Sequence, residues 1–158
     1  MKLSLTETVA RPASEVWHAL AHEFDQISEW YTPVVKSYEL PDAEPLAGAT
    51  KNGRICEFDA EGSRRAVETI TGWDEDARKI DVNVEIEGAS AALPVARNTV
   101  SFQVEPVDDG HSIVHFESNL ELRLHGYLLF PFVKLGLTKS FGSLLQDLKG
   151  HVESRAAA

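Results

Sequence analysis

The last thirty-odd residues constrain the fold most, because His125–Ser154 is the longest stretch of the chain that can form one helix. On a helical wheel, six apolar side chains fall within about a third of a turn of one direction: Phe130, Leu137, Phe141, Leu144, Leu148 and Val152. In the second half of the stretch the opposite face is polar, with Lys139, Gln146, Lys149 and Glu153. This pattern predicts a long helix whose apolar face lies against a larger structure.

The N-terminal half of this helix is apolar on its far side as well, at Leu128, Phe132 and Leu135. A helix that is apolar all round is normally covered all round. We therefore expect this half to be buried, either by loops near the mouth of a cavity or by a second subunit. The second alternative predicts a homodimer formed through Leu128, Phe132 and Leu135.

Glycine and proline residues bear on the shape of the same helix. Gly136 and Gly142 each lower helix propensity by roughly 1 kcal/mol, which makes the middle of the helix a candidate for a bend. Pro131 is compatible with the helix if the helix starts near Gly126, because proline is tolerated in a first turn.

Most of the chain before this helix has the pattern of short strands. Lys79–Glu87 gives the clearest signal, since Ile80, Val82, Val84 and Ile86 alternate with polar residues. Two short helical segments, Ser14–Phe24 and Gln26–Trp30, follow the first strand, and Gly88–Val95 is expected to be a loop. The predicted strands are Lys2–Val9, Val34–Leu40, Ala49–Phe58, Arg64–Trp73, Lys79–Glu87, Arg97–Glu105 and Ser112–Leu122.

The order of these elements predicts an α+β fold. Six sequential strands joined by short turns form an antiparallel meander, in which one face of each strand is wet. The dry face must be covered, and only the C-terminal helix is long enough to cover it. The chain has 158 residues, no internal repeat and no linker, so we expect a single domain over residues 1–158.

Charge and cysteine content exclude several function classes. The net charge of −10 argues against nucleic acid, because phosphate binding needs a basic surface. The single cysteine, Cys56, cannot form an internal disulfide, and the N-terminus lacks the apolar core of a secretory signal, so a cytoplasmic location is expected. The most apolar run, Leu128–Leu137, is too short to span a membrane and contains Pro131 and Lys134.

Several stretches resemble one superfamily. The stretch Val9–Leu20 reads VARPASEVWHAL, and Phe24-Asp25 and Trp30-Tyr31-Thr32-Pro33 follow it. Further matching stretches are Gly53–Phe58, Glu68–Glu75 and Val100–Pro106. With these residues the chain resembles the START/Bet v 1-like (SRPBCC) superfamily, and within it is most similar to the bacterial polyketide cyclase/dehydrase branch.

The resemblance implies a helix-grip fold, in which a curved antiparallel sheet of seven strands wraps around the long C-terminal helix and leaves a cavity. The superfamily includes lipid carriers, plant hormone receptors and aromatase/cyclases. No stretch of this chain matches a motif diagnostic of one of these activities, and the Cys/His pattern of a Rieske iron–sulfur centre is absent.

Motifs for metal, cofactor and nucleophile chemistry are weak or missing. His18 and His22 are four residues apart, with Glu15 before them, which is a spacing typical of metal ligands. The helical wheel places all three on the face opposite Trp17, so we expect them in solvent and predict no metal. The chain has no GxSxG elbow and no glycine-rich phosphate loop, and we predict no cofactor.

A cavity between sheet and helix is therefore the expected site, and polar side chains in phase with the apolar face are the informative ones. Asn98 and Ser118 are expected to form hydrogen bonds there, and Trp30 and Tyr31 to line or cap the entrance. Alternatively, these polar residues reach water near strand ends. The expected ligand-binding residues are Trp30, Tyr31, Arg54, Val82, Val84, Asn98, Phe102, Phe116, Ser118 and Phe132.

Two functions remain open. In the first, the protein binds or carries a small, mainly hydrophobic molecule in the cavity and catalyses nothing. In the second, it is a polyketide cyclase/dehydratase-like enzyme with an acid–base pair in the cavity, for which Glu7, Arg54 and Glu68 are weak catalytic candidates. An inward-facing Arg54 needs a carboxylate such as Glu7 or Glu68, or an anionic ligand group, because an unpaired buried charge is costly.

Overall fold

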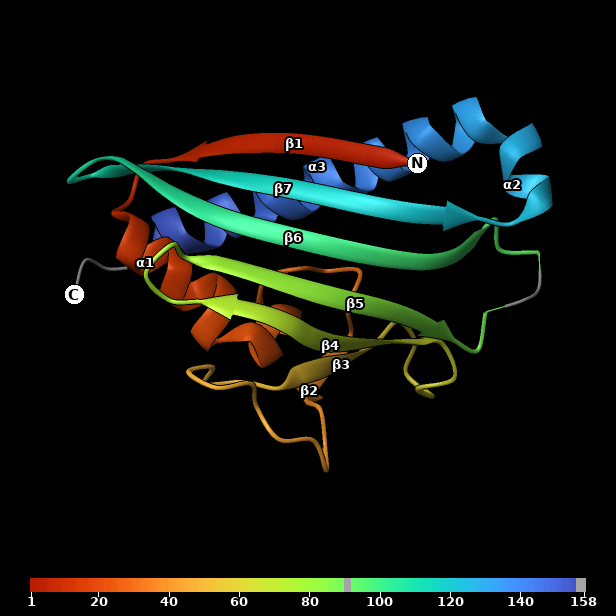
Figure 1. Ribbon diagram of the computed structural model, residues 1–158, viewed down its shortest axis with the longest axis horizontal. Coiled ribbons are helices and arrows are strands. Elements are labelled where there is room, and N and C mark those ends of the chain that lie inside the picture. The colour runs from red at the N-terminus through yellow and green to blue at the C-terminus, as the bar shows by residue number, and fades with distance from the viewer. Residues whose placement is uncertain (90–91, 156–158) are drawn as a thin grey trace.

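A computed structural model describes residues 1–89 and 92–155 of the chain (Figure 1). Its sheet has seven strands, all antiparallel, in the order β1-β7-β6-β5-β4-β3-β2. The predicted strands are all present, although several ends differ. They are β1 Lys2–Val9, β2 Lys36–Glu39, β3 Gly53–Glu57, β4 Arg65–Asp74, β5 Lys79–Glu87, β6 Val95–Asp108 and β7 His111–Leu122. Part of the predicted loop over residues 88–95 lies outside the described residues.

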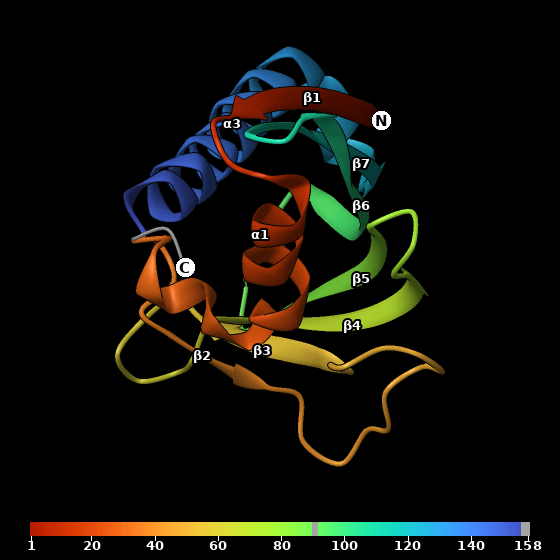
Figure 2. The same cartoon turned by 90° about the vertical axis from the view of Figure 1, so that its left-hand side faces the viewer.

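Strand β7 shows most clearly why these residues form a curved sheet with one dry face. Every second residue is buried, from Ser112 through Phe116 to Leu122, and the residues between them are exposed or half-buried. β1 pairs with β7 along its whole length, which brings the start of the chain to the edge of the meander. Viewed end-on, the sheet forms an open arc from β1 to β2 (Figure 2).

The short helices after β1 lie in front of this arc (Figure 2). α1 (Ala13–Trp17) continues into a π-helical turn, η1 (His18–His22), and a 3₁₀ segment, η2 (Phe24–Glu29), follows. In the π-turn the N–H of Glu23 donates to the carbonyl oxygen of His18 at 2.9 Å, five residues back. A wider turn rotates the following side chains relative to an α-helix. This rotation changes where His22 points.

The C-terminal helical region consists of two helices, and the prediction of one helix from His125 is wrong in this respect. α2 (Leu124–Leu128) ends at Leu129, whose φ of −98° and ψ of 11° are not helical, and α3 runs from Phe130 to Ser154. Pro131 then sits in the first turn of α3, where its missing N–H costs no hydrogen bond. The interruption therefore lies at Leu129, and α3 continues through both Gly136 and Gly142.

The apolar stripe of α3 packs onto the sheet mainly in its C-terminal half. Leu145, Leu148 and Val152 are buried there, and Leu148 and Val152 belong to the predicted stripe. Leu137, Phe141 and Leu144 are half-buried, and Phe130 is exposed. The predicted stripe thus holds from Leu137 onward, and in the turns before it only the half-buried Val133 packs against the core, at Leu3, Leu120 and Leu122.

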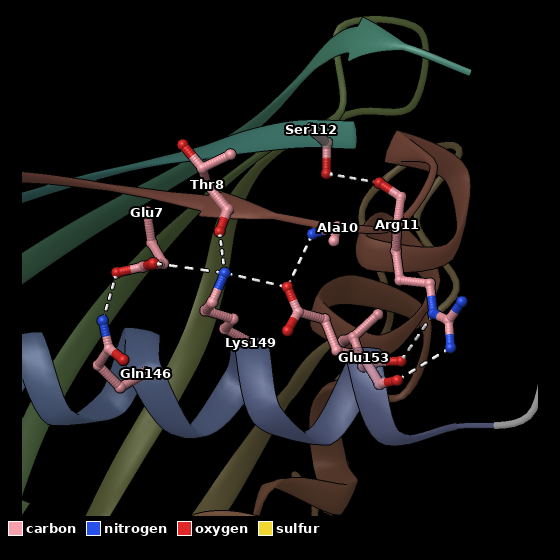
Figure 3. A network of polar contacts seen from close by, with 9 residues as sticks. Glu7, Thr8, Ala10, Arg11, Ser112, Gln146, Lys149 and Glu153 are labelled. Carbon is pink, nitrogen blue, oxygen red and sulfur yellow. Dashed lines mark hydrogen bonds and ion pairs between the residues drawn. The ribbon is translucent and has the colours of Figure 1, made fainter. Parts of the chain in front are cut away.

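Arg11 fixes the C-terminal end of α3 (Figure 3). Its Nη2 donates to the carbonyl oxygens of Glu153 at 2.9 Å and Arg155 at 2.7 Å, and its Nε donates to that of Val152 at 3.3 Å. The last carbonyls of a helix have no partner inside the helix, and a cation there also favours the helix dipole. Ser112 on β7 donates to the carbonyl oxygen of Arg11 at 3.1 Å and holds this segment in place.

Candidate functional site

A partly open pocket of about 340 Å³ lies between the sheet and α3. This volume is at the lower end of the range of roughly 300–1,000 Å³ that small-molecule sites occupy. Side chains from β3 to β7, from η2 and from α3 form its wall. The described lining residues are Ile27, Tyr31, Val34, Arg54, Phe58, Ala66, Glu68, Val82, Val84, Ile86, Leu93, Val95, Asn98, Val100, Phe102, Phe116, Leu120, Leu137, Ser140, Phe141 and Leu144.

Strands β5 and β6 separate at one end of the sheet, and apolar side chains line the rim of the pocket there. Their pairing ends at Val84 and Asn98, although β5 continues to Glu87 and β6 begins at Val95. The two strands therefore diverge at this end, close to α2 (Figure 1). Ile86, Leu93 and Val95 line the pocket here, and Ile86 is exposed.

Arg54 and Glu68 form the most polar part of the wall. They are directly opposite each other on β3 and β4, and Nε and Nη2 of Arg54 lie 2.8 and 2.7 Å from Oε2 of Glu68. Arg54 also donates from Nη1 to the carbonyl oxygen of Phe24 at 2.8 Å, and its guanidinium lies 3.9 Å from the centre of that ring. Each nitrogen of the buried guanidinium thus has a partner, and Glu68 is the carboxylate that meets it.

Cys56 lies behind this ion pair, with its Sγ 3.9 Å from Oε1 of Glu68. The thiol is almost completely buried, and this burial raises the pKa of Cys56 to about 12 even though Arg54 acts in the opposite direction. A thiol with such a pKa is protonated at neutral pH and is a poor nucleophile. Cys56 therefore packs as a small apolar residue.

Asn98 and Ser118 form a second polar contact across β6 and β7. The hydroxyl of Ser118 donates to Oδ1 of Asn98 at 2.6 Å. Asn98 lines the pocket, whereas Ser118 is fully buried behind it. No hydrogen bond in the described part of the chain uses Nδ2 of Asn98, so this amide is a donor that a pocket ligand can use.

The concave-face residues of β5, β6 and β7 were the easiest to place from sequence. Val82 and Val84 on β5, Phe102 on β6 and Phe116 on β7 all line the pocket. Tyr31, which follows η2, lines it as well. The four strand residues come together because strand alternation sends their side chains to the same face.

Trp30 and Phe132, which the sequence also predicts in the site, lie elsewhere. The ring of Trp30 stacks on His151 of α3 with a centroid distance of 5.9 Å and packs against the core, so it braces η2 rather than lining the pocket. Phe132 is 75% exposed and points away from the sheet. Its position on α3 places it opposite the stripe that faces the pocket.

Glu7 faces α3, not the pocket (Figure 3). Its Oε2 accepts a hydrogen bond from Nε2 of Gln146 at 2.6 Å, and its Oε1 lies 3.9 Å from Nζ of Lys149. Lys149 also donates to the carbonyl oxygen of Thr8 at 2.6 Å. Glu7 thus joins β1 to the C-terminal half of α3, and this position does not suit a catalytic acid or base in the pocket.

In the part of the chain that the structure describes, loops do not cover the apolar far side of α2 and of the first turns of α3, and that alternative of the sequence prediction is wrong. Leu128, Phe132 and Leu135 are 84%, 75% and 71% exposed. The loop before β6 instead contacts α2 through His125, whose Nε2 is 3.1 Å from the carbonyl oxygen of Ala92. The described chain therefore presents these three side chains to its surroundings.

The histidines near η1 do not share one environment. His18 is solvated as predicted, with its side chain 61% exposed, but His22 is only 22% exposed because the π-turn rotates it toward Trp17 and Trp73. Its Nε2 lies 2.8 Å from Oε1 of Glu75. Partial burial raises the pKa of Glu75, but hydrogen bonds from His22, Trp17 and Trp73 together outweigh this and leave the pKa below its usual value. The cluster joins η1 to the β4–β5 turn.

Sequence reasoning missed some lining residues that carry weak signals. Ser140 is three residues after Leu137 and four before Leu144, which is the spacing of one helix face. Ile27 lies inside the short 3₁₀ segment η2 and Phe58 directly after β3, where periodicity says little about direction. None of the helices in the described residues is long and apolar enough to cross a membrane.

Comparison of the sequence with models of known protein families identifies the family of this chain. Residues 1–153 match the family described as polyketide cyclase / dehydrase and lipid transport. The chain belongs to this family. Among curated proteins, none matches the sequence.

Solved structures with the same fold are numerous. A START superfamily protein from Mycobacterium smegmatis has a TM-score of 0.75 at 15% identity, over 96% of this chain and 97% of that one. The ZhuI aromatase/cyclase from Streptomyces sp. R1128 also has a TM-score of 0.75, at 16% identity, over 100% and 96%. The di-domain aromatase/cyclase BexL of the BE-7585A biosynthetic pathway scores 0.74 at 20% identity, over 97% of this chain and 46% of that one. At these identities the likeness extends to the helix-grip fold and no further.

Proposed function

We propose that this protein binds or carries a small, mainly hydrophobic molecule in the pocket between the sheet and α3. The observation that carries the proposal is the composition of the pocket wall, in which only five of the described residues are polar: Tyr31, Arg54, Glu68, Asn98 and Ser140. Burial of a ligand's apolar surface contributes roughly 25 cal/mol per Å², so such a wall favours an apolar ligand.

The polar groups suit a neutral ligand better than a charged one. Arg54 is already paired with Glu68, so an anionic ligand has to compete with that carboxylate. The free Nδ2 of Asn98 and the hydroxyl groups of Tyr31 and Ser140 can each form a hydrogen bond with a carbonyl or hydroxyl group. A compact molecule with an apolar body and one or two such groups fits this arrangement.

The alternative of an enzyme with an acid–base pair has one supporting observation, which is that Arg54 and Glu68 both line the pocket. Their geometry argues against it. Oε2 of Glu68 already accepts from two guanidinium nitrogens, so it is not free to take a proton from a ligand, and an arginine does not release its proton at physiological pH. We therefore favour binding without catalysis.

Ligand binding is tested with the purified full-length chain and the uncharged fluorescent probe N-phenyl-1-naphthylamine, together with native mass spectrometry of molecules that co-purify. Val84→Trp fills the pocket from β5, and Thr99→Trp adds the same ring to the exposed outer face of β6. We expect saturable probe binding that Val84→Trp weakens at least tenfold and Thr99→Trp leaves unchanged. Equal binding by both variants contradicts the proposal.

The Glu68→Gln variant separates the two functions. If the protein is only a binder, Glu68→Gln retains probe affinity within a few-fold and no polyketone model substrate is turned over by either protein. If instead the unmodified chain turns over the substrate, and Glu68→Gln loses this turnover but still binds the probe, the protein is an enzyme.

A further inference from the structure

Seven of the eleven large apolar side chains that are exposed in the described chain lie between Leu124 and Leu135, on α2 and the first turns of α3. Five of them are at least 61% exposed, and we call these the α2–α3 face: Leu124, Tyr127, Leu128, Phe132 and Leu135. Leu124 is 87% exposed and Tyr127 is 61% exposed, and the other three are at least 71% exposed. Contiguous apolar surface of this kind usually marks a site of interaction.

Charge is distributed unusually around the α2–α3 face. Residues 122–146 contain no aspartate or glutamate. With 25 acidic residues in 158, a stretch of 25 residues would carry about four on average. The same stretch contains Arg123, Lys134 and Lys139, so it has a net charge of +3 in a chain with a net charge of −10.

These three basic residues are available to a partner. In the part of the chain that the structure describes, none of them forms a salt bridge, although Lys2, Lys51, Lys79 and Lys149 all do. All three are exposed. The α2–α3 face therefore combines apolar side chains with uncompensated positive charge.

From this combination we propose that the α2–α3 face docks on the surface of an anionic lipid membrane. A helix that lies in the membrane interface has large apolar residues on one side and lysine or arginine beside them, as here. Figure 1 shows α2 and the first turns of α3 at one end of the molecule, extending past the start of β1.

A second copy of the chain fits the α2–α3 face less well. In a two-fold dimer the same surface meets itself, which brings the basic residues of two copies together without an acidic residue from residues 122–146 of either copy. An anionic membrane supplies the missing negative charge, and each lysine or arginine near it contributes about fivefold to binding. The proposal does not depend on a ligand in the pocket, although Leu137, two residues after Leu135, lines the pocket.

Flotation with vesicles tests the proposal. The full-length chain is mixed with vesicles of phosphatidylcholine and phosphatidylglycerol at a ratio of about 7:3, or of phosphatidylcholine alone, at low and at high salt. We expect binding to the anionic vesicles that high salt weakens, and at least tenfold weaker binding to the neutral ones.

Two sets of variants identify the surface. Leu128→Glu/Phe132→Glu is expected to abolish binding, and Lys134→Gln/Lys139→Gln to weaken it about 25-fold, at fivefold for each charge. The controls are Val107→Glu, an exposed apolar residue near the β6–β7 turn, and Lys79→Gln on β5. Both controls are expected to bind like the unmodified chain. All these positions are exposed, and unchanged thermal unfolding shows that each variant is folded.

Several outcomes overturn the proposal. Equal binding to both vesicle types excludes the preference for anionic lipid. Unchanged binding by the α2–α3 variants excludes this surface as the docking site. The proposal is also wrong if the unmodified chain binds neither vesicle type and sediments as a dimer, whereas Leu128→Glu/Phe132→Glu sediments as a monomer. That result shows that the α2–α3 face forms an interface between two copies of the chain. Val84→Trp is expected to float with anionic vesicles normally, so failure of pocket binding and failure of membrane docking are distinguishable.

Discussion

At the scale of single residues, Arg54 shows how the pocket can be lined by a charge and still suit an apolar ligand. Removal of a guanidinium from water is costly, and Glu68 and the carbonyl oxygen and ring of Phe24 together replace the lost hydration. Because these partners are all internal, the charge of Arg54 is compensated before any ligand arrives.

The pairing of Arg54 with Glu68 leads to a prediction about stability. Glu68→Leu leaves a buried cation without its carboxylate and is expected to lower the free energy of unfolding by about 3 kcal/mol. The double variant Arg54→Met/Glu68→Leu is expected to be more stable than Glu68→Leu alone, because it removes the unpaired charge. Urea unfolding at pH 7 measures both.

An exposed pair provides the control for that experiment. Arg65 and Glu87 lie 2.6 Å apart but are 39% and 48% exposed. Arg65→Met is expected to change stability by less than about 1 kcal/mol, because surface pairs contribute little. A loss in Glu68→Leu no larger than in Arg65→Met would contradict the role given to burial.

His151 gives a prediction about pH. Burial, and secondarily the charge of Arg155, lower the pKa of His151, although Glu23 and Glu29 act in the opposite direction. The unfolded chain then binds a proton at a higher pH than the folded one, so stability is complete above the ordinary histidine pKa of about 6.5 and falls as the pH drops below it. His151→Phe retains an aromatic ring against Trp30 but cannot be protonated.

We therefore expect the unmodified chain to lose more stability than His151→Phe between pH 7.5 and pH 5, as measured by urea midpoints. The other five histidines are present in both proteins, so their titration cancels in the difference. An identical pH dependence of the two proteins would rule out His151 as the source.

At the scale of elements, alternation was enough to predict the strands. Lys2–Val9 and Lys79–Glu87 have the bounds that the sequence predicts, because each has one apolar and one polar side. The helices were harder. The π-turn at His18–His22 and the break at Leu129 are single irregular turns, and a helical wheel assumes that no such turn exists. For that reason the expected positions of His22 and of the start of the long helix were wrong.

The C-terminal end of α3 gives a prediction at this scale. Arg11→Met removes two hydrogen bonds to carbonyls of α3, one to the carbonyl of Arg155 directly after it, and the charge near the negative end of the helix, and is expected to cost about 2 kcal/mol. Arg11→Lys keeps the charge but not the fork of donors, so it is expected to recover only part of the loss. Thermal unfolding of the three proteins measures the order, and equal stability of Arg11→Met and the unmodified chain contradicts the assignment.

At the scale of the whole molecule, the face of the sheet could be predicted but not the outline of the pocket. Val84 and Asn98 face the pocket because alternation fixes their phase along β5 and β6, whereas β3 is buried on both faces and alternation left the direction of Arg54 open. Glu7 has the correct phase too, yet it meets α3 because β1 lies beside the anchored end of that helix. Which concave residues reach the pocket depends on where α3 crosses the sheet, and this information is not local in sequence.

The two halves of α3 should differ in dynamics, since one is anchored and the other is not. Leu145, Leu148 and Val152 are buried and Arg11 holds the end, whereas the first turns present Phe132 and Leu135 to solvent. Local opening costs least where few apolar contacts are broken. We expect the backbone amides of residues 130–137 to exchange hydrogen at least a hundredfold faster than those of residues 145–152 in the unmodified chain. Anionic vesicles are expected to slow exchange in the first segment and leave the second unchanged, and uniform protection along α3 without vesicles would contradict this division.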